Sequence, residues 1–116
     1  MHLDPAVTDP DNYKVILENA RVRVLEYKDK PGDKTHLHHH PDSMMYFLSS
    51  FKRKIEMNGK EVTVDGKKDT VAWLNEQDHF GSNIGDTETH VLFVELKEKN
   101  NNIKETASVL GPNKEG

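Results

Sequence analysis

Short apolar runs separated by turn signals are the feature of this sequence that most restricts its fold. The runs are rich in β-branched and aromatic residues, and none extends into a long helical period. The turn signals between them are Pro31-Gly32, Pro41-Asp42, Asn58-Gly59, Asp65-Gly66 and Gly85-Asp86. Many short strands at this spacing predict an all-β sandwich or barrel.

Eight segments are predicted strands: residues 13–17, 22–27, 36–39, 44–49, 53–57, 61–64, 70–74 and 90–96. Asn58-Gly59 is the best single turn signal among them. Both residues accept a positive φ at low cost, which a two-residue type I′ hairpin requires. We therefore expect the strands on either side of this pair to run antiparallel.

Length and charge limit the classes of function that are open to the chain. Its 116 residues suit one compact domain. The net charge of -4 comes from mixed acidic and basic residues, and no basic patch predicts a nucleic-acid partner. The apolar runs are too short to cross a membrane. The sequence has no cysteine, which excludes disulfides and thiolate metal sites. Taken together, these features lead us to expect a cytoplasmic protein.

The two ends of the sequence differ from its middle. Residues 1–11 contain prolines at positions 5 and 10 and are predicted to form an extended arm. Residues 12–97 carry the predicted strands and form the expected domain. Residues 98–116 are predicted to be a polar tail that frays or lies on the surface.

Four of the seven histidines lie in the run from His36 to His40. On an extended strand, alternation would place His36, His38 and His40 on one face and His39 on the other. Two imidazoles at i and i+2 can chelate one ion, and neutral imidazole suits Zn, Fe, Cu and Ni alike. A third ligand must come from elsewhere, and His79 is the best candidate. A solvated histidine surface without a role is the alternative reading of the same run.

Two short motifs resemble those of the cupin family. Gly32 is followed after five residues by His38-x-His40, which resembles the first cupin motif. Downstream, His79 precedes Asn83 by four positions, which resembles the end of the second motif.

Further stretches, at residues 17–24 and 93–97, are similar to small single-domain cupins associated with β-alanine degradation. The resemblance covers about residues 9–97. It implies a cupin double-stranded β-helix, or jelly-roll barrel, with one divalent metal ion held by His38, His40 and His79.

The sequence departs from the cupin pattern at the carboxylate ligand. The motif's glutamate would fall at Met45, or at Met44 in the shorter spacing. Three histidines alone leave coordination positions open and keep the full positive charge of the ion, which makes it a stronger Lewis acid. Some cupins that oxidise thiols or diketones resemble this ligand set.

The pocket beside the expected site can also be predicted from the strand pattern. Met45 and Phe47 should face it with apolar atoms, and Trp73 is a further candidate for its lining. Glu95 lies in a late strand, and its side chain could point inward as a substitute carboxylate.

The leading hypothesis is a mononuclear-metal enzyme that acts on a small polar molecule, with Fe, Zn, Ni, Mn or Cu as the ion. An Fe(II) three-histidine dioxygenase is its most specific form, with His36 as a candidate acid–base group. The alternatives are a non-catalytic module that binds a small metabolite and a degenerate site without metal. We expect a homodimer, because small cupins commonly pair and exposed strand edges need covering.

Overall fold

Nine strands and one helical turn account for the regular elements of the computed structural model, which describes residues 3–98. The elements are α1 (Pro5–Thr8), β1 (Tyr13–Glu18), β2 (Val22–Asp29), β3 (His38–His40), β4 (Ser43–Phe47), β5 (Phe51–Met57), β6 (Lys60–Gly66), β7 (Val71–Leu74), β8 (Gln77–Asn83) and β9 (Thr89–Leu96). No helix within this part of the chain is long or apolar enough to span a membrane.

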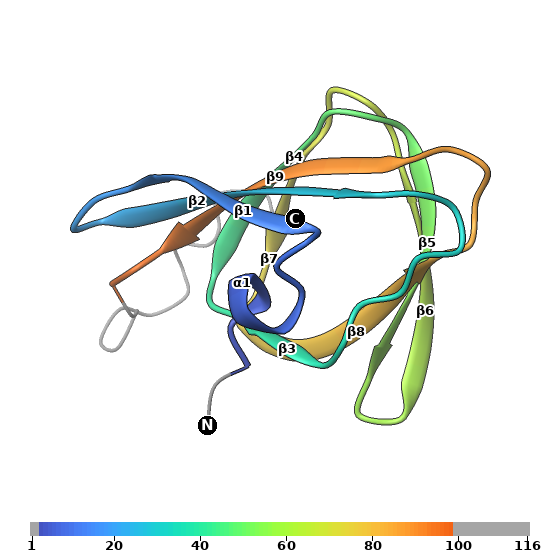
Figure 1. Cartoon of the computed structure of the whole chain (residues 1–116), viewed down its shortest axis with the longest axis horizontal. Helices are drawn as coiled ribbons and strands as arrows, with labels where there is room; N and C mark the ends of the chain where they lie inside the picture. The colour runs from blue at the N-terminus through green and yellow to red at the C-terminus, as the bar shows by residue number, and fades with distance from the viewer. Residues whose placement is uncertain (1–2, 99–116) are drawn as a thin grey trace, which may run out of the picture.

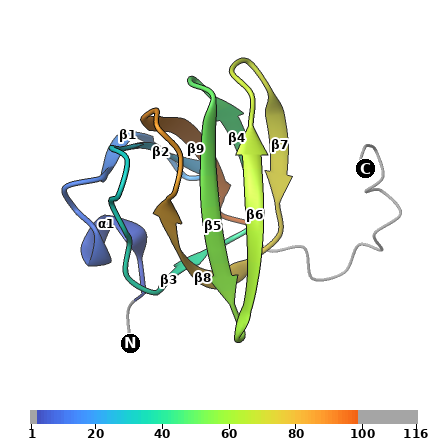
Figure 2. The same cartoon turned by 90° about the vertical axis from the view of Figure 1, so that its right-hand side faces the viewer.

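The strands form two antiparallel sheets that face each other. One has five strands in the order β1-β2-β9-β4-β7, and the other has four in the order β3-β8-β5-β6. Seen along the shortest axis, the two sheets curve around a shared interior, with β2 and β9 opposite β3 and β8 (Figure 1). The turned view shows α1 lying beside the end of the barrel where β3 runs (Figure 2). The predicted all-β barrel is confirmed.

Strand alternation decides which side chains enter this interior. In β9, Thr89, Val91, Phe93 and Glu95 are buried, while the residues between them are more exposed. β2 pairs with β9 along its whole length, so its inward residues lie opposite these positions. The buried apolar core consists of Tyr13, Leu25, Tyr27, Phe47, Phe51, Val91 and Phe93.

The predicted hairpin at Asn58-Gly59 is confirmed. Asn58 has φ 52° and Gly59 has φ 78°, the positive values that a type I′ turn needs. Met57 pairs with Lys60 directly across the turn, and β5 and β6 stay in register up to Phe51 opposite Gly66.

Three local predictions are wrong. The strand predicted at residues 36–39 begins only at His38, and β8 was not predicted at all. The predicted extended arm contains the helical turn α1, because the Asp4 side chain accepts a hydrogen bond from the Ala6 N–H and Pro5 occupies the first turn.

The predicted tail lies outside the described residues, apart from residue 98.

Candidate metal centre

Three histidines from two strands meet inside the barrel. β3 and β8 pair antiparallel with His38 opposite His79, and the alternation of β3 points His38 and His40 inward together. One nitrogen from each ring lies within 4.8 Å of the others. The three side chains are buried, with exposed fractions of 1%, 0% and 7% for His38, His40 and His79. The structure thus brings together the three residues that the sequence singled out.

Hydrogen bonds fix which nitrogen each outer ring presents to the others. His38 Nδ1 donates to the carbonyl oxygen of His36 over 2.7 Å, and His79 Nδ1 donates to Gln77 Oε1 over 2.7 Å. Metal-binding histidines commonly use one nitrogen in this way, which fixes the tautomer and the ring orientation. Nε2 of both rings is therefore left with a lone pair for a ligand.

His40 provides the strongest test of whether a metal ion fits. Both of its ring nitrogens are buried and have no hydrogen-bond partner within residues 3–98. The ring stacks on Phe93, with centroids 4.8 Å apart and planes 7° from parallel. An unsatisfied buried polar group costs about 1–3 kcal/mol. A divalent transition metal shared with His38 and His79 would use one of these nitrogens, so the residues fit such an ion.

The protonation state of the three rings suits metal binding. Burial lowers the pKa of His38, and burial together with neighbouring histidines lowers the pKa of His40 well below its ordinary value. Burial, helped by His38 and Arg53, lowers the pKa of His79 to about 4. All three rings are therefore neutral at pH 7, which is the form that binds metal.

His36 does not share the inward face that the sequence predicted for it. Since β3 begins at His38, the alternation does not extend back to His36, whose side chain is 80% exposed. Its Nδ1 lies 2.8 Å from Asp9 Oδ1, and its main-chain carbonyl orients His38. His36 thus contacts the site through its backbone, while its ring lies at the surface.

Asp9 is a residue near the site that the sequence analysis missed. The segment after α1 buries its carboxylate, which accepts the His36 N–H and lies 3.8 Å from His38 Nδ1. Asp9 therefore acts on His38 through His36, since it holds the His36 backbone and ring while the His36 carbonyl orients His38. The signal that could have revealed it is Asp4-Pro5, a typical helix start that turns the arm back onto β3.

Tyr13, also missed, reaches the cluster from β1. Its hydroxyl oxygen lies 3.5 Å from His38 Nε2, and its ring is in contact with those of His38 and His40. Burial raises its pKa well above the ordinary value, so the hydroxyl stays protonated and can donate a hydrogen bond beside the site.

The other predicted pocket residues divide into inward and outward positions. Met45 and Phe47 line the interior as predicted. Trp73 does not, because it pairs with the outward Met44; it is 52% exposed and donates its indole N–H to Asn75 Oδ1. Glu95 does point inward and is buried, but its carboxylate binds Arg23 over 2.8 Å and is not part of the three-histidine group.

A cavity of about 240 Å³ opens beside the cluster. Its walls are mainly apolar and include Met45, Phe47 and Phe51, and its polar lining includes His38 and His79. This volume lies below the range of about 300–1,000 Å³ that is usual for drug-sized ligands. The cavity therefore suits a small molecule held against the histidines.

Comparison with known proteins identifies the fold. No protein-family model and no curated protein matches the sequence. Among solved structures, a cupin domain from Bordetella pertussis has a TM-score of 0.70 and 26% identity, over 74% of this chain and 92% of its own. A double-stranded β-helix protein from Klebsiella pneumoniae has a TM-score of 0.58 and 20% identity, over 72% of this chain and 70% of its own.

A third structure, described as a predicted oxalate decarboxylase from Thermotoga maritima, has a TM-score of 0.52 and 22% identity, over 72% of this chain and 78% of its own. The architecture of this chain is the double-stranded β-helix. Cupin-domain proteins are among its structural neighbours, so the chain has the cupin fold.

Proposed function

We propose that this chain is a mononuclear metal-binding cupin whose ion is held by His38, His40 and His79. The observation that carries the proposal is His40, a fully buried imidazole with neither nitrogen hydrogen-bonded to the described residues. When bound, a divalent ion would supply Lewis acidity, and Fe(II) would in addition supply dioxygen activation.

We further propose that the site acts on a small polar molecule, and that an Fe(II) dioxygenase is its most specific form. The apolar walls of the cavity would exclude water, and the neutral Tyr13 hydroxyl would donate a hydrogen bond to a substrate atom beside His38. We keep His36 as a candidate proton carrier, because its exposed ring is bonded to Asp9, which also approaches His38.

Metal analysis of protein purified without oxygen tests the metal site. We expect about one equivalent of metal in the wild type and little in a His38→Ala/His40→Ala variant. His90→Ala is the matched control, since His90 pairs with Glu26 away from the cluster. Equal metal contents in the wild type and the double variant would show that the histidines hold no ion.

Oxygen uptake after iron loading tests the dioxygenase form against thiols, diketones and small acids. Zinc-only protein that consumes no oxygen after iron loading would refute this form and leave the metal site intact. Tight ligand binding without turnover would instead support a non-catalytic binding module.

We also propose a homodimer. The outer face of the five-stranded sheet exposes Val71, Trp73 and Leu96, with exposed fractions of 59%, 52% and 38%. A second copy packed on this face would cover these apolar side chains. Light scattering should give twice the monomer mass, and Trp73→Glu should shift it toward the monomer. A wild type that is monomeric at high concentration would refute this proposal.

Two narrower proposals rest on the cupin resemblance and the composition. One is a role in β-alanine degradation, suggested by residues 17–24 and 93–97, and the other is a cytoplasmic location. Growth of a deletion strain on β-alanine tests the first, and cell fractionation tests the second.

A further inference from the structure

Arg53 is a buried cation that uses only one side of its guanidinium group. The residue is 7% exposed. Its hydrogen bonds of standard geometry to residues 3–98 are both made by Nη1, which donates to Asp29 Oδ2 and, over 3.1 Å, to Thr89 Oγ1, and the guanidinium group also interacts with the Tyr27 hydroxyl. The guanidinium carbon also lies 5.2 Å from the centre of the Tyr27 ring. Nε and Nη2 are therefore left as donors for a ligand.

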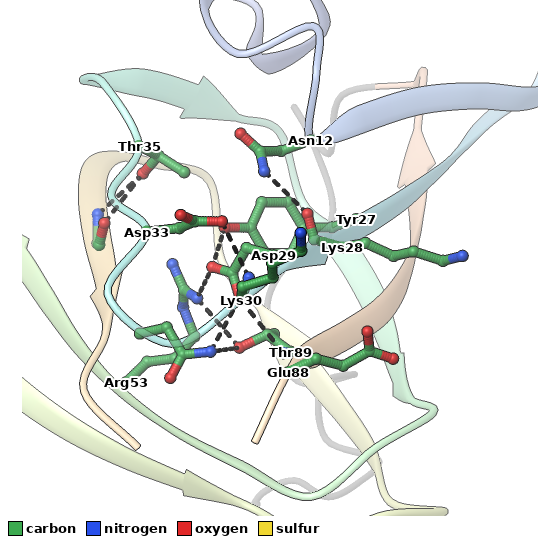
Figure 3. Close-up of polar contacts among 12 residues, drawn as sticks. Asn12, Tyr27, Lys28, Asp29, Lys30, Asp33, Thr35, Arg53, Glu88 and Thr89 are labelled. Atoms are coloured by element: carbon green, nitrogen blue, oxygen red, sulfur yellow. Dashed lines mark hydrogen bonds and ion pairs between the residues drawn. The ribbon is translucent and has the colours of Figure 1, made fainter. Parts of the chain in front are cut away.

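Strand register explains how this arrangement forms. Asp29 lies opposite Thr89 where β2 and β9 pair, and Arg53 lies opposite Asn83 where β5 and β8 pair. Figure 3 shows Asp29 among Tyr27, Arg53 and Thr89. The polar side chains of Tyr27, Asp29, Arg53 and Thr89 therefore lie together inside the barrel.

Asp29 does not require the whole guanidinium group. Its fully buried carboxylate also accepts hydrogen bonds from the Tyr27 hydroxyl at 2.5 Å, the Asn83 amide at 3.0 Å and the Thr89 N–H at 3.3 Å. The carboxylate is thus held by several donors and serves as a fixed anchor for Nη1. A fixed guanidinium with donors to spare is preorganised to bind an anion.

Arg53 borders the cavity beside the histidines, and its Nη2 lies close to Gly81, another lining residue. Arg53, His38 and His79 all line it, and Arg53 is the one formally charged side chain among its described lining residues. Gly81 keeps space open here, because a Cβ on it would lie 3.3 Å from Arg53 Nη2 and 2.9 Å from Ile55 Cδ1.

We propose that Arg53 binds the carboxylate of a small carboxylic acid, whose apolar part fills the cavity. A planar guanidinium matches a carboxylate with two parallel hydrogen bonds. One available guanidinium in apolar walls favours a monocarboxylate over a phosphate, which carries more charge and needs more donors. The placement of the opposite end of the acid at the histidines rests on the proposed metal site, whereas the role of Arg53 does not.

The test measures binding of isovalerate and of its neutral isostere isovaleramide to the full chain stripped of metal by a chelator. Calorimetry should show isovalerate binding at least tenfold more tightly than isovaleramide. In a ¹⁵N spectrum, the Arg53 Nε–Hε signal should shift with isovalerate and stay in place with isovaleramide. Because no metal is present, failure here is distinguishable from failure of the metal proposal, which zinc titration measures separately.

Arg53→Lys keeps a cation beside Asp29 but removes the Nε and Nη2 donors, so the preference for isovalerate should fall at least tenfold. Arg23→Lys is the matched control, because Arg23 pairs with Asp4 and Glu95 outside the cavity lining and its replacement should leave the preference unchanged. If Arg53→Lys does not fold, the double variant Asp29→Asn/Arg53→Met is tested in its place. It removes both buried charges together, and it should lose the preference for isovalerate. Equal affinity for the two probes, absence of binding, or an unchanged preference in the variant would each overturn the proposal.

Discussion

Replacing His40 with leucine should stabilise the metal-free protein and abolish its response to metal. Leucine is close to histidine in size and has no polar atom to leave unsatisfied. The native ring is fully buried, with neither nitrogen hydrogen-bonded within the described chain. We expect the free energy of unfolding of the metal-free variant to exceed that of the wild type, because this desolvation cost disappears.

The expected size of the change follows from the surroundings of His40. Each unsatisfied nitrogen costs about 1–3 kcal/mol. Loss of the stack on Phe93 lowers the free energy of unfolding of the variant by about 1 kcal/mol, which offsets part of this gain. The net gain is at least about 1 kcal/mol, and each kcal/mol raises Tm by about 4–8 °C in a domain of this size.

Thermal unfolding with and without zinc measures both effects. Zinc at a thousand times its Kd should stabilise the wild type by about 4 kcal/mol and so raise its Tm. It should leave the Tm of His40→Leu unchanged. His90→Leu is the control, since it removes a 2.7 Å contact with Glu26 and should lower stability without altering the zinc response. A metal-free His40→Leu protein that is less stable than the wild type, or that still responds to zinc, would refute the reasoning.

Three further predictions follow from the structure. Asp9→Ala should weaken zinc affinity about 10–100-fold, because the carboxylate supports His38. Asp11→Ala, at an exposed position, is the control and should leave the affinity unchanged. Equal Kd values for the wild type and Asp9→Ala in a zinc titration would contradict this role. The pKa of His79 is 6.5 ordinarily and about 4 in the folded protein, so the unfolded chain binds a proton first as pH falls. Urea unfolding of the metal-free protein should therefore show stability that falls below about pH 6.5. His79 alone should lower it by about 3 kcal/mol near pH 4, and the lowered pKa values of His38 and His40 act in the same direction; a flat profile would contradict the shifts. Gly59→Ala should cost about 1 kcal/mol because Gly59 has φ 78°, and an unchanged urea midpoint would argue against strain at this turn.

Local sequence patterns predicted most of the strands but not all of the site. Alternation and turn residues predicted the β5–β6 hairpin and the inward positions of Met45 and Phe47. β8 escaped prediction because its residues, Gln77-Asp78-His79-Phe80-Gly81-Ser82-Asn83, are largely polar or small. They form a strand because both neighbours, β3 and β5, pair with it.

Trp73 and His36 show where the local pattern failed. Trp73 is apolar, but its register opposite Met44 places it on the outer face. His36 has the right spacing, but the strand begins two residues later, so its ring lies at the surface.

By itself, the sequence determined the all-β class and the shared face of His38 and His40, because these depend on turn residues that fix φ and on alternation within one strand. It offered His79 as a third ligand only through its place in the chain and a motif resemblance. His38 and His40 share a face wherever that segment is extended. Only the tertiary structure decided that His79 joins them, that Asp9 and Tyr13 support them, and that Arg53 lies in the same cavity. These contacts join residues far apart in the chain through sheet pairing and burial, and local sequence patterns carry no information about such distant partners.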